Sequence, residues 1–159
     1  MEIEQIDMDV ELLDLLRTSS LPTSDLEKDY AKVQFFGVRM GSILAGVIGL
    51  ETYGSTAILR SLAVKKSFRK NGIGLGLVSY TERIAAESGV KDLYLLTENA
   101  AGYFERLGYK VVKREDLPET IRKSTQFSEI CPATAVVMVK SLPDRMAGAD
   151  PSHNSSGVT

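Results

Sequence analysis

The alternation of apolar and polar residues divides the chain into predicted strands and helices. Runs rich in β-branched and aromatic residues predict strands, which span residues 2–7, 31–40, 42–53, 56–64, 91–97, 109–114 and 133–142. Apolar residues three and four positions apart predict helices, which span residues 9–19, 72–89, 98–108 and 116–130. Residues 21–29 are interpreted as a break or as a further short helix that begins at Thr23 or Ser24.

Several predicted helices carry end signals. Asp9 is a candidate N-cap of the first helix, with residues that include Val10 and Leu16 expected on its inner face. Gly89 and Gly108 stand where the next two helices end, at the C′ position that glycine favours because it adopts positive φ readily.

The order of these elements predicts a mixed sheet. Strands 31–40, 42–53 and 56–64 follow one another through short turns and therefore form an antiparallel meander. A helix lies between strands 56–64 and 91–97, and a helical crossover returns the chain in the same direction, so this pair is parallel. The predicted fold class is α+β (α/β).

Composition narrows the class of protein further. The chain has 159 residues, 43% of them hydrophobic and 25% charged, which predicts one globular domain over residues 1–142. The Pro-, Gly- and Ser-rich tail 143–159 is expected to be disordered. The net charge of -2 gives no electrostatic case for nucleic acid, and no apolar run approaches the ~20 residues of a membrane span. The acidic N-terminus lacks the basic region of a signal peptide, which predicts a cytoplasmic protein.

The single cysteine, Cys131, and the single histidine, His153, limit the chemistry available to the chain. One cysteine forms no internal disulfide, and a lone cysteine is more often a small buried apolar residue than a nucleophile. His153 lies in the tail, so neither a Ser-His-Asp triad nor a Cys-His pair is expected. A metal site is not expected either.

The segment "RKNGIG", residues 69–74, is the clearest candidate for a phosphate site. It is not a P-loop, because no Gly-Lys-Ser/Thr occurs in the chain, and Leu77 stands where a dinucleotide fingerprint needs its third glycine. Arg69, Gly72 and Gly74 instead form Arg-x-x-Gly-x-Gly at a helix start, where exposed amides and the helix dipole favour a pyrophosphate. The alternative is a turn whose glycines only permit close packing.

Residues 59–109 resemble the core of the GCN5-related N-acetyltransferases. "LRSLAV" resembles their fourth strand, "RKNGIG" their acetyl-CoA pyrophosphate motif, and "YFERLGY" their Phe-Tyr-x-x-x-Gly-Phe signature. The resemblance implies the GNAT fold: a mixed, mostly antiparallel sheet of six to seven strands, splayed at the acetyl-CoA site, with helices on both faces. It also implies acetyl-CoA as co-substrate and leaves a homodimer open, since family members often dimerise.

The resemblance assigns residues to acetyl-CoA. Main-chain groups of Leu62, Ala63 and Val64 would pair with the pantetheine arm as a further strand would. Arg69 and the amides that follow it would hold the pyrophosphate; these amides belong to Lys70, Asn71, Gly72, Ile73, Gly74 and Leu75.

Two positions depart from the family pattern. Phe104 stands where relatives often have a tyrosine that protonates the leaving thiolate, and Thr97 stands where they often have an asparagine that contacts CoA. Tyr103 is adjacent to Phe104 but about 100° around the helix, so it is expected to point elsewhere. Water could protonate the thiolate, because a thiol has a pKa of about 8.5.

Three residues are candidates for the chemistry on the acceptor side. Glu51 is the best candidate base, and the alternative is a solvated charge at a strand end. Arg60 interrupts an apolar strand, so it either clamps an anionic group of the substrate or pairs with Glu51. Ser61 lies next to Arg60 and shares its face only if a β-bulge intervenes, a feature that the family's fourth strand commonly has. Arg122, Lys123 and Gln126 are expected either in one wall of the cleft or on an ordinary surface helix.

The sequence predicts an N-acetyltransferase that moves an acetyl group from acetyl-CoA directly to a small amine. Residues 51–138 resemble acetyltransferases found with arsenic-resistance genes, which points to an amino-acid-like or organoarsenical acceptor. The alternatives are an acetyl-CoA-binding regulatory module without activity, favoured by Phe104, and a protein or peptide N-acetyltransferase.

Overall fold

The computed structural model describes residues 1–143 except 22, 25, 27–31 and 125–133. Its strands form one seven-stranded sheet in the order β1-β2-β3-β4-β5-β7-β6. The strands are β1 Ile3–Ile6, β2 Val33–Met40, β3 Ile43–Tyr53, β4 Thr56–Val64, β5 Asp92–Thr97, β6 Lys110–Val112 and β7 Val136–Ser141. The helices are α1 Val10–Thr18, α3 Ile73–Glu87, α4 Ala101–Arg106 and α5 Glu119–Arg122, with 3-10 turns at Lys66–Phe68 and Arg114–Asp116.

Every predicted strand is confirmed, and so are three of the four main helices. The helix predicted over residues 116–130 ends at Arg122, where the Ser124 amide and hydroxyl both bond to the carbonyl of Ile121 and tighten the chain into a turn. Much of the segment 21–29 lies outside the described residues, as do Gln126, Cys131 and the tail from residue 144.

Helix α1 begins as predicted, and its buried face agrees only in part with the prediction. The Leu12 amide donates to the Asp9 carboxylate at 3.0 Å, which confirms the N-cap. Val10 is 72% exposed, so its expected place on the inner face is wrong. Leu16 is buried as predicted, and Leu12 and Leu15 are buried with it, because these three leucines form the stripe that meets the sheet.

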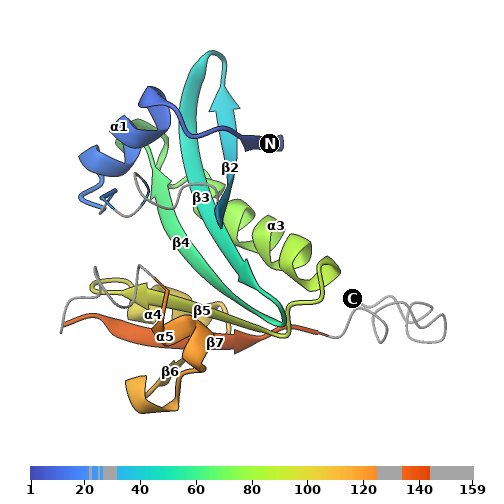
Figure 1. The fold of residues 1–159 in the computed structure, drawn as a ribbon. Helices are drawn as coiled ribbons and strands as arrows, with labels where there is room; N and C mark the ends of the chain where they lie inside the picture. Colours follow the sequence, from blue (N-terminus) through green and yellow to red (C-terminus); the bar gives the residue numbers. More distant parts are fainter. Residues whose placement is uncertain (22, 25, 27–31, 125–133, 144–159) are drawn as a thin grey trace, which may run out of the picture.

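The sheet is antiparallel except at its centre, where β4 and β5 run parallel. Their pairing covers only Thr56–Ile58 and Asp92–Tyr94, although both strands continue beyond it. Figure 1 shows the two strands meeting at one end and diverging toward the other. The predicted splay is therefore present, and it leaves one edge of β4 without a neighbouring strand in the described chain.

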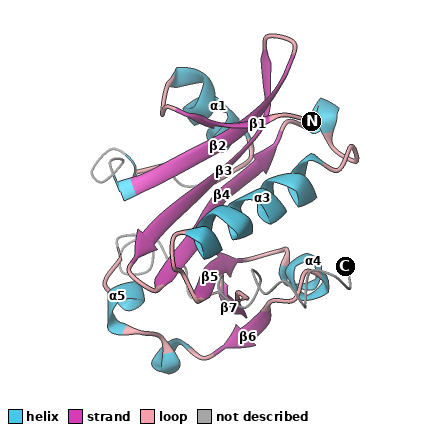
Figure 2. Cartoon of the chain, turned by 90° about the vertical axis from the view of Figure 1, so that its right-hand side faces the viewer, coloured by secondary structure: helices cyan, strands magenta, loops and turns pink. Residues whose placement is uncertain are grey.

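Helices cover both faces of the sheet, as predicted. Helices α3 and α4 contribute to the largest core cluster, whereas α1 and α5 contribute to two separate clusters on the opposite face (Figures 1 and 2). The start of α3 lies close to the sheet because position 46 is a glycine: a Cβ there would lie 2.7 Å from the Ile73 side chain. This contact places the beginning of α3 beside the end of β4.

A polar cluster joins the outer half of the sheet to α3. The Tyr109 hydroxyl donates to Glu82 at 2.8 Å, and the Lys140 ammonium binds the other oxygen of Glu82 at 3.0 Å. Tyr109 is 2% exposed, so its hydroxyl depends on this partner. The cluster links α3 to β7 through side chains that are distant in sequence.

Replacing Tyr109 with phenylalanine is expected to lower the free energy of unfolding by about 1.5 kcal/mol, because a hydrogen bond to a charged group is lost. Burial, and next the Glu82 carboxylate, raise the pKa of Tyr109, so the folded protein keeps this phenol protonated. The unfolded chain releases the proton above about pH 10, so the wild type loses stability as the pH rises further and the variant loses less. Urea unfolding at about pH 7 and pH 10.5 measures both effects, and equal alkaline losses would contradict this account.

In the part of the chain that the structure describes, no helix is both long and apolar enough to cross a membrane. The same residues include no group of His, Cys, Asp and Glu side chains arranged to hold a metal ion.

Candidate functional site

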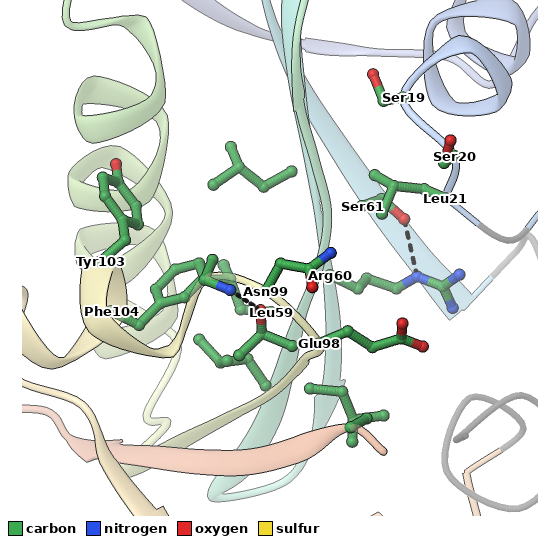
Figure 3. Close-up of a pocket in the computed structure, with 16 residues that line it drawn as sticks. Ser19, Ser20, Leu21, Leu59, Arg60, Ser61, Glu98, Asn99, Tyr103 and Phe104 are labelled. Atoms are coloured by element: carbon green, nitrogen blue, oxygen red, sulfur yellow. Dashed lines mark hydrogen bonds between the residues drawn. The ribbon is translucent and has the colours of Figure 1, made fainter. Parts of the chain in front are cut away.

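A cavity of about 500 Å³ opens where β4 and β5 diverge (Figure 3). We call it the slot cavity. Residues from both strands, from the loop after α1, from the start of α4 and from the segment just before β7 line it. They are Ser19, Ser20, Leu21, Leu59, Arg60, Ser61, Leu62, Leu95, Leu96, Thr97, Glu98, Asn99, Ala100, Tyr103, Phe104 and Ala135. The cavity thus lies at the carboxyl ends of parallel strands, where open sheets commonly bind ligands.

A bulge in β4 brings two polar residues to this cavity. Gly49 of β3 pairs with Arg60 and Val47 pairs with Ala63, so β4 carries one residue more than its partner between these pairs. Ser61 occupies the bulge with a φ of 57°. The bulge predicted for this strand is present, and it allows both Arg60 and Ser61 to line the slot cavity.

Arg60 is held by a buried ion pair. Its Nη1 lies 2.8 Å from Glu51 Oε2, and the two side chains are 2% and 4% exposed. The Tyr53 hydroxyl donates to the other Glu51 oxygen at 2.6 Å. Arg60 Nε donates to the Ser61 hydroxyl at 3.1 Å, drawn as a dashed line in Figure 3. The pairing of Arg60 with Glu51, one of the two alternatives for Arg60, is therefore present.

A second cavity, of about 620 Å³, lies at the start of α3. We call it the loop cavity. The end of β4, the loop that follows it and the first turn of α3 supply most of its lining. The lining consists of Ser19, Leu21, Leu62, Ala63, Val64, Phe68, Arg69, Lys70, Gly72, Ile73, Gly74, Leu75, Ala100 and Tyr103.

The first turn of α3 presents donors to the loop cavity. Gly72 is the N-cap with a φ of 75°, a conformation that glycine adopts without strain, and no side chain caps the helix. The first amides of a helix have no partners within it, and they lie at the positive end of its dipole. Residues 65–72, between β4 and α3, carry four basic side chains, and we call this segment the basic loop. Arg69 donates from Nε to the Val64 carbonyl at 3.1 Å, which connects the basic loop to the end of β4.

The two cavities meet along a shared wall. Leu62, Ala100 and Tyr103 line both of them, as do two residues of the loop after α1. Together they form a path from the start of α3, along the unpaired edge of β4, to the gap beside β5. This path suits an elongated ligand that has an anionic group at one end and a reactive group at the other.

Tyr103 and Phe104 are neighbours in α4, and their side chains point in different directions, as expected. Their rings are 5.2 Å apart at 79°, and Phe104 faces the slot cavity alone, whereas Tyr103 borders both cavities. A Cβ at Gly74 would lie 3.4 Å from the Tyr103 hydroxyl, so this hydroxyl points toward the start of α3. Burial raises the pKa of Tyr103, with Arg106 acting in the opposite direction, so the phenol remains a hydrogen-bond donor at neutral pH.

Of the residues predicted to bind acetyl-CoA or to act in the chemistry, all but Glu51 and Asn71 line one of the cavities. Thr97 lines the slot cavity, where its hydroxyl accepts from the Ala100 amide at 2.9 Å and shapes the turn into α4. Arg122 and Lys123 were expected either in one wall of the cleft or on a surface helix. They are exposed and line neither cavity, which agrees with the second alternative.

Three further polar residues of the slot cavity were not predicted from the sequence: Ser20, Glu98 and Asn99. A signal for Glu98 and Asn99 was available, since they directly follow β5 at the edge of the sheet where parallel strands end. No local signal marks Ser20, because its place in the cavity depends on how α1 packs against the sheet.

Solved structures share the fold of this chain. N-acetylglutamate synthase from Neisseria gonorrhoeae, in complex with coenzyme A and N-acetyl-glutamate, superposes with a TM-score of 0.74 at 21% identity, over 89% of this chain and 35% of that chain. An aminoglycoside 6'-N-acetyltransferase in complex with coenzyme A superposes with a TM-score of 0.69 at 24% identity, over 91% of this chain and 99% of that chain.

Curated relatives match in sequence over part of their length. An uncharacterized N-acetyltransferase of Chlorobaculum tepidum is 40% identical over 87 residues, which cover 54% of this chain and 56% of the relative. A putative acetyltransferase of Bacillus subtilis is 33% identical over 75 residues, which cover 46% of this chain and 51% of the relative. The chain thus spans about half the length of these relatives.

The family model described as the acetyltransferase (GNAT) domain matches residues 31–111, just over half of the 159-residue chain. The matched segment contains β2 to β5, with the splayed strands, the basic loop and α3, and it ends within β6. The chain belongs to the GNAT acetyltransferase family.

Proposed function

We propose that the protein is an acetyl-CoA-dependent N-acetyltransferase acting on a small amine. The observation that carries the proposal is the pair of joined cavities, one beside the helix start that follows a basic loop, the other in the gap between β4 and β5. The family supports the chemistry, and the coenzyme A complexes of its structural neighbours support the ligand.

The loop cavity would hold the pyrophosphate. Amides of Lys70 to Leu75 would bind it at the start of α3, and Arg69 would add charge-assisted hydrogen bonds. The open edge of β4 at Leu62, Ala63 and Val64 would pair with the amides of the pantetheine arm. That placement would bring the thioester to the slot cavity beside Phe104.

The reaction would be a direct transfer. The neutral amine nitrogen attacks the thioester carbonyl carbon, the carbon–sulfur bond breaks, and the new amide nitrogen gives up one proton. Positioning the two reactants supplies much of the rate, and a base adds roughly 10²–10⁴-fold. Phe104 cannot donate a proton, so the departing thiolate would take its proton from water.

The proton of the amine needs an acceptor. Glu51 receives hydrogen bonds from Arg60 and Tyr53 and does not line the cavity, so we propose that it positions Arg60. Glu98 lines the slot cavity, is exposed, and is drawn with its carboxylate beside the cavity in Figure 3. We therefore assign the proton-accepting carboxylate to Glu98, directly or through a water molecule.

The acceptor is proposed to be small and amino-acid-like. The resemblance of residues 51–138 to acetyltransferases found with arsenic-resistance genes keeps an amine-bearing organoarsenical among the candidates. A cytoplasmic location and a homodimer complete the proposal.

Release of the free CoA thiol tests the proposed activity. Acetyl-CoA is incubated with a panel of L-amino acids, polyamines, aminoglycosides, organoarsenical amines and short peptides, and mass spectrometry identifies the product. Acceptor-dependent thiol release with an acetylated small amine is expected. Tight acetyl-CoA binding without release under any acceptor would instead indicate a regulatory module, which Phe104 favours, and acetylated peptide alone would indicate a peptide acetyltransferase.

A further inference from the structure

Left-handed backbone conformations mark the two cavities. Among the described residues, three that are not glycine have positive φ: Ser20 at 61°, Ser61 at 57° and Lys70 at 73°. Ser20 and Ser61 line the slot cavity and Lys70 lines the loop cavity. A side chain with a Cβ is disfavoured in this region, and such residues gather at functional sites.

Ser20 differs from the residues at the equivalent position of two other helices in the chain, which are glycines. Helices α1, α3 and α4 each end in a residue with positive φ at the C′ position, whose amide and that of the next residue bond back into the helix. The other two helices use Gly89 and Gly108, which adopt this φ without cost. Only α1, whose end lines the slot cavity, has serine there. Ending the helix does not require a side chain at position 20, so the geometry of the helix end does not account for the hydroxyl there.

Ser61 presents a donor to the same cavity. Its oxygen accepts the hydrogen bond from Arg60 Nε, and its own proton has no acceptor among the described residues. A hydroxyl that accepts from a cation is polarised, so it donates more strongly. Tyr53 and Arg60 both donate to Glu51, and Arg60 also donates to Ser61. Within this network the Ser61 hydroxyl faces the cavity, so it presents a hydrogen-bond donor there and not a base.

We propose that Ser20 and Ser61 bind an oxyanion group of the acceptor, such as a carboxylate or a phosphonate. In Figure 3 both hydroxyls lie on the α1 side of the slot cavity, and Glu98 lies apart from them. The serines hold the anionic group of the acceptor, and Glu98 holds its amine. This inference rests on the proposed function, because it names the class of acceptor that the transferase uses.

The test compares acceptors that differ only in this group. L-amino acids and aminoalkylphosphonates are each matched with the corresponding amide or alkylamine. Binding is measured by calorimetry with CoA present, and thiol release is measured with acetyl-CoA. The acids are expected to bind about tenfold or more tightly than their neutral partners, since a hydrogen bond to a charged group is worth at least that factor. Equal affinities of acids and neutral partners would overturn the inference.

Variants at position 20 separate binding from backbone strain. Ser20→Ala and Ser20→Gly both remove the hydroxyl, but only glycine relieves the conformation, so the melting temperature of Ser20→Gly is expected about 2–4 °C above that of Ser20→Ala. Both variants, and Ser61→Ala, are expected to raise KM for the acidic acceptor about tenfold while KM for acetyl-CoA stays within about twofold. Ser88→Ala, which removes a hydroxyl that donates to Ile84 far from the cavity, is the control.

The outcomes distinguish this inference from the proposed function. A melting-temperature difference at position 20 with an unchanged acceptor KM would make Ser20 structural and would overturn the inference. Binding of acids without thiol release would leave the oxyanion site standing and would contradict the transferase. Thiol release with neutral amines alone would support the transferase and would contradict the oxyanion site. If no acid binds at all, the inference fails.

Discussion

Replacing Glu51 with alanine is expected to lower the free energy of unfolding by about 3–5 kcal/mol, the largest stability loss that we predict. The change removes the Glu51 carboxylate, which lies 2.8 Å from the charged Arg60 side chain, and only 2% of that side chain is exposed. It also removes the acceptor of the Tyr53 hydroxyl. Denaturant unfolding at neutral pH measures the loss.

A double variant shows whether the charge or the lost volume causes this effect, and an exposed ion pair provides the control. Replacing both Glu51 and Arg60 with leucine removes both charges, and a buried ion pair can often be exchanged for apolar residues at little cost. The double variant is therefore expected to be more stable than Glu51→Ala. Lys123→Ala breaks an exposed pair with Glu119, 73% and 66% exposed, and is expected to cost less than about 0.5 kcal/mol. If Glu51→Ala costs as little as this control, the ion pair does not stabilise the site.

Replacing Gly74 with valine is expected to weaken acetyl-CoA binding about 100-fold or more. A Cβ added at this position would lie 3.4 Å from the Tyr103 hydroxyl and 3.8 Å from the Val64 side chain. The two methyl groups of valine would therefore extend into the loop cavity. They would cover the amides that are proposed to hold the pyrophosphate, and the loss of two charge-assisted hydrogen bonds accounts for a change of that size. Calorimetric titration with acetyl-CoA measures the affinity.

Gly102→Val is the matched control for this variant. Gly102 also lies in a helix and lines neither cavity, and a Cβ there meets nothing within 4 Å. Both variants exchange glycine for a residue with higher helix propensity, so neither is expected to unfold the protein. Acetyl-CoA affinity is expected to stay unchanged in Gly102→Val. Unchanged affinity in Gly74→Val would place the pyrophosphate elsewhere.

Local sequence was sufficient to predict most of the fold. Strand β4 spans the predicted residues 56–64. Asp9 begins its helix as an N-cap, and Gly89 and Gly108 end theirs with positive φ, as their chemistry favours. These features depend on neighbours in the chain. The inner face of α1 was only partly predictable in this way. Val10 and Leu12 each lie at helical spacing from other leucines of α1, and only the packing of α1 on the sheet selects between the two sets.

The candidate site was predictable where a motif is contiguous and less so where it is assembled from distant segments. Arg69 and the residues after it follow one another and line one cavity. Glu51 and Arg60 were each singled out, but only the register of β3 against β4 shows that they bind each other. Ser20 was not predicted because its place in the slot cavity depends on the tertiary packing of α1.

The central claim is that the end of β4 and the start of α3 form one acetyl-CoA site. Amide chemical shifts of the 15N-labelled protein, recorded during titration with acetyl-CoA, test it most directly, and ADP serves as a control that carries a pyrophosphate without the pantetheine arm. With acetyl-CoA, we expect the largest shifts both at Leu62–Val64 and at Lys70–Leu75; with ADP, we expect them at Lys70–Leu75 alone. Shifts confined to other segments, or an unaffected β4 at saturating acetyl-CoA, would contradict the account.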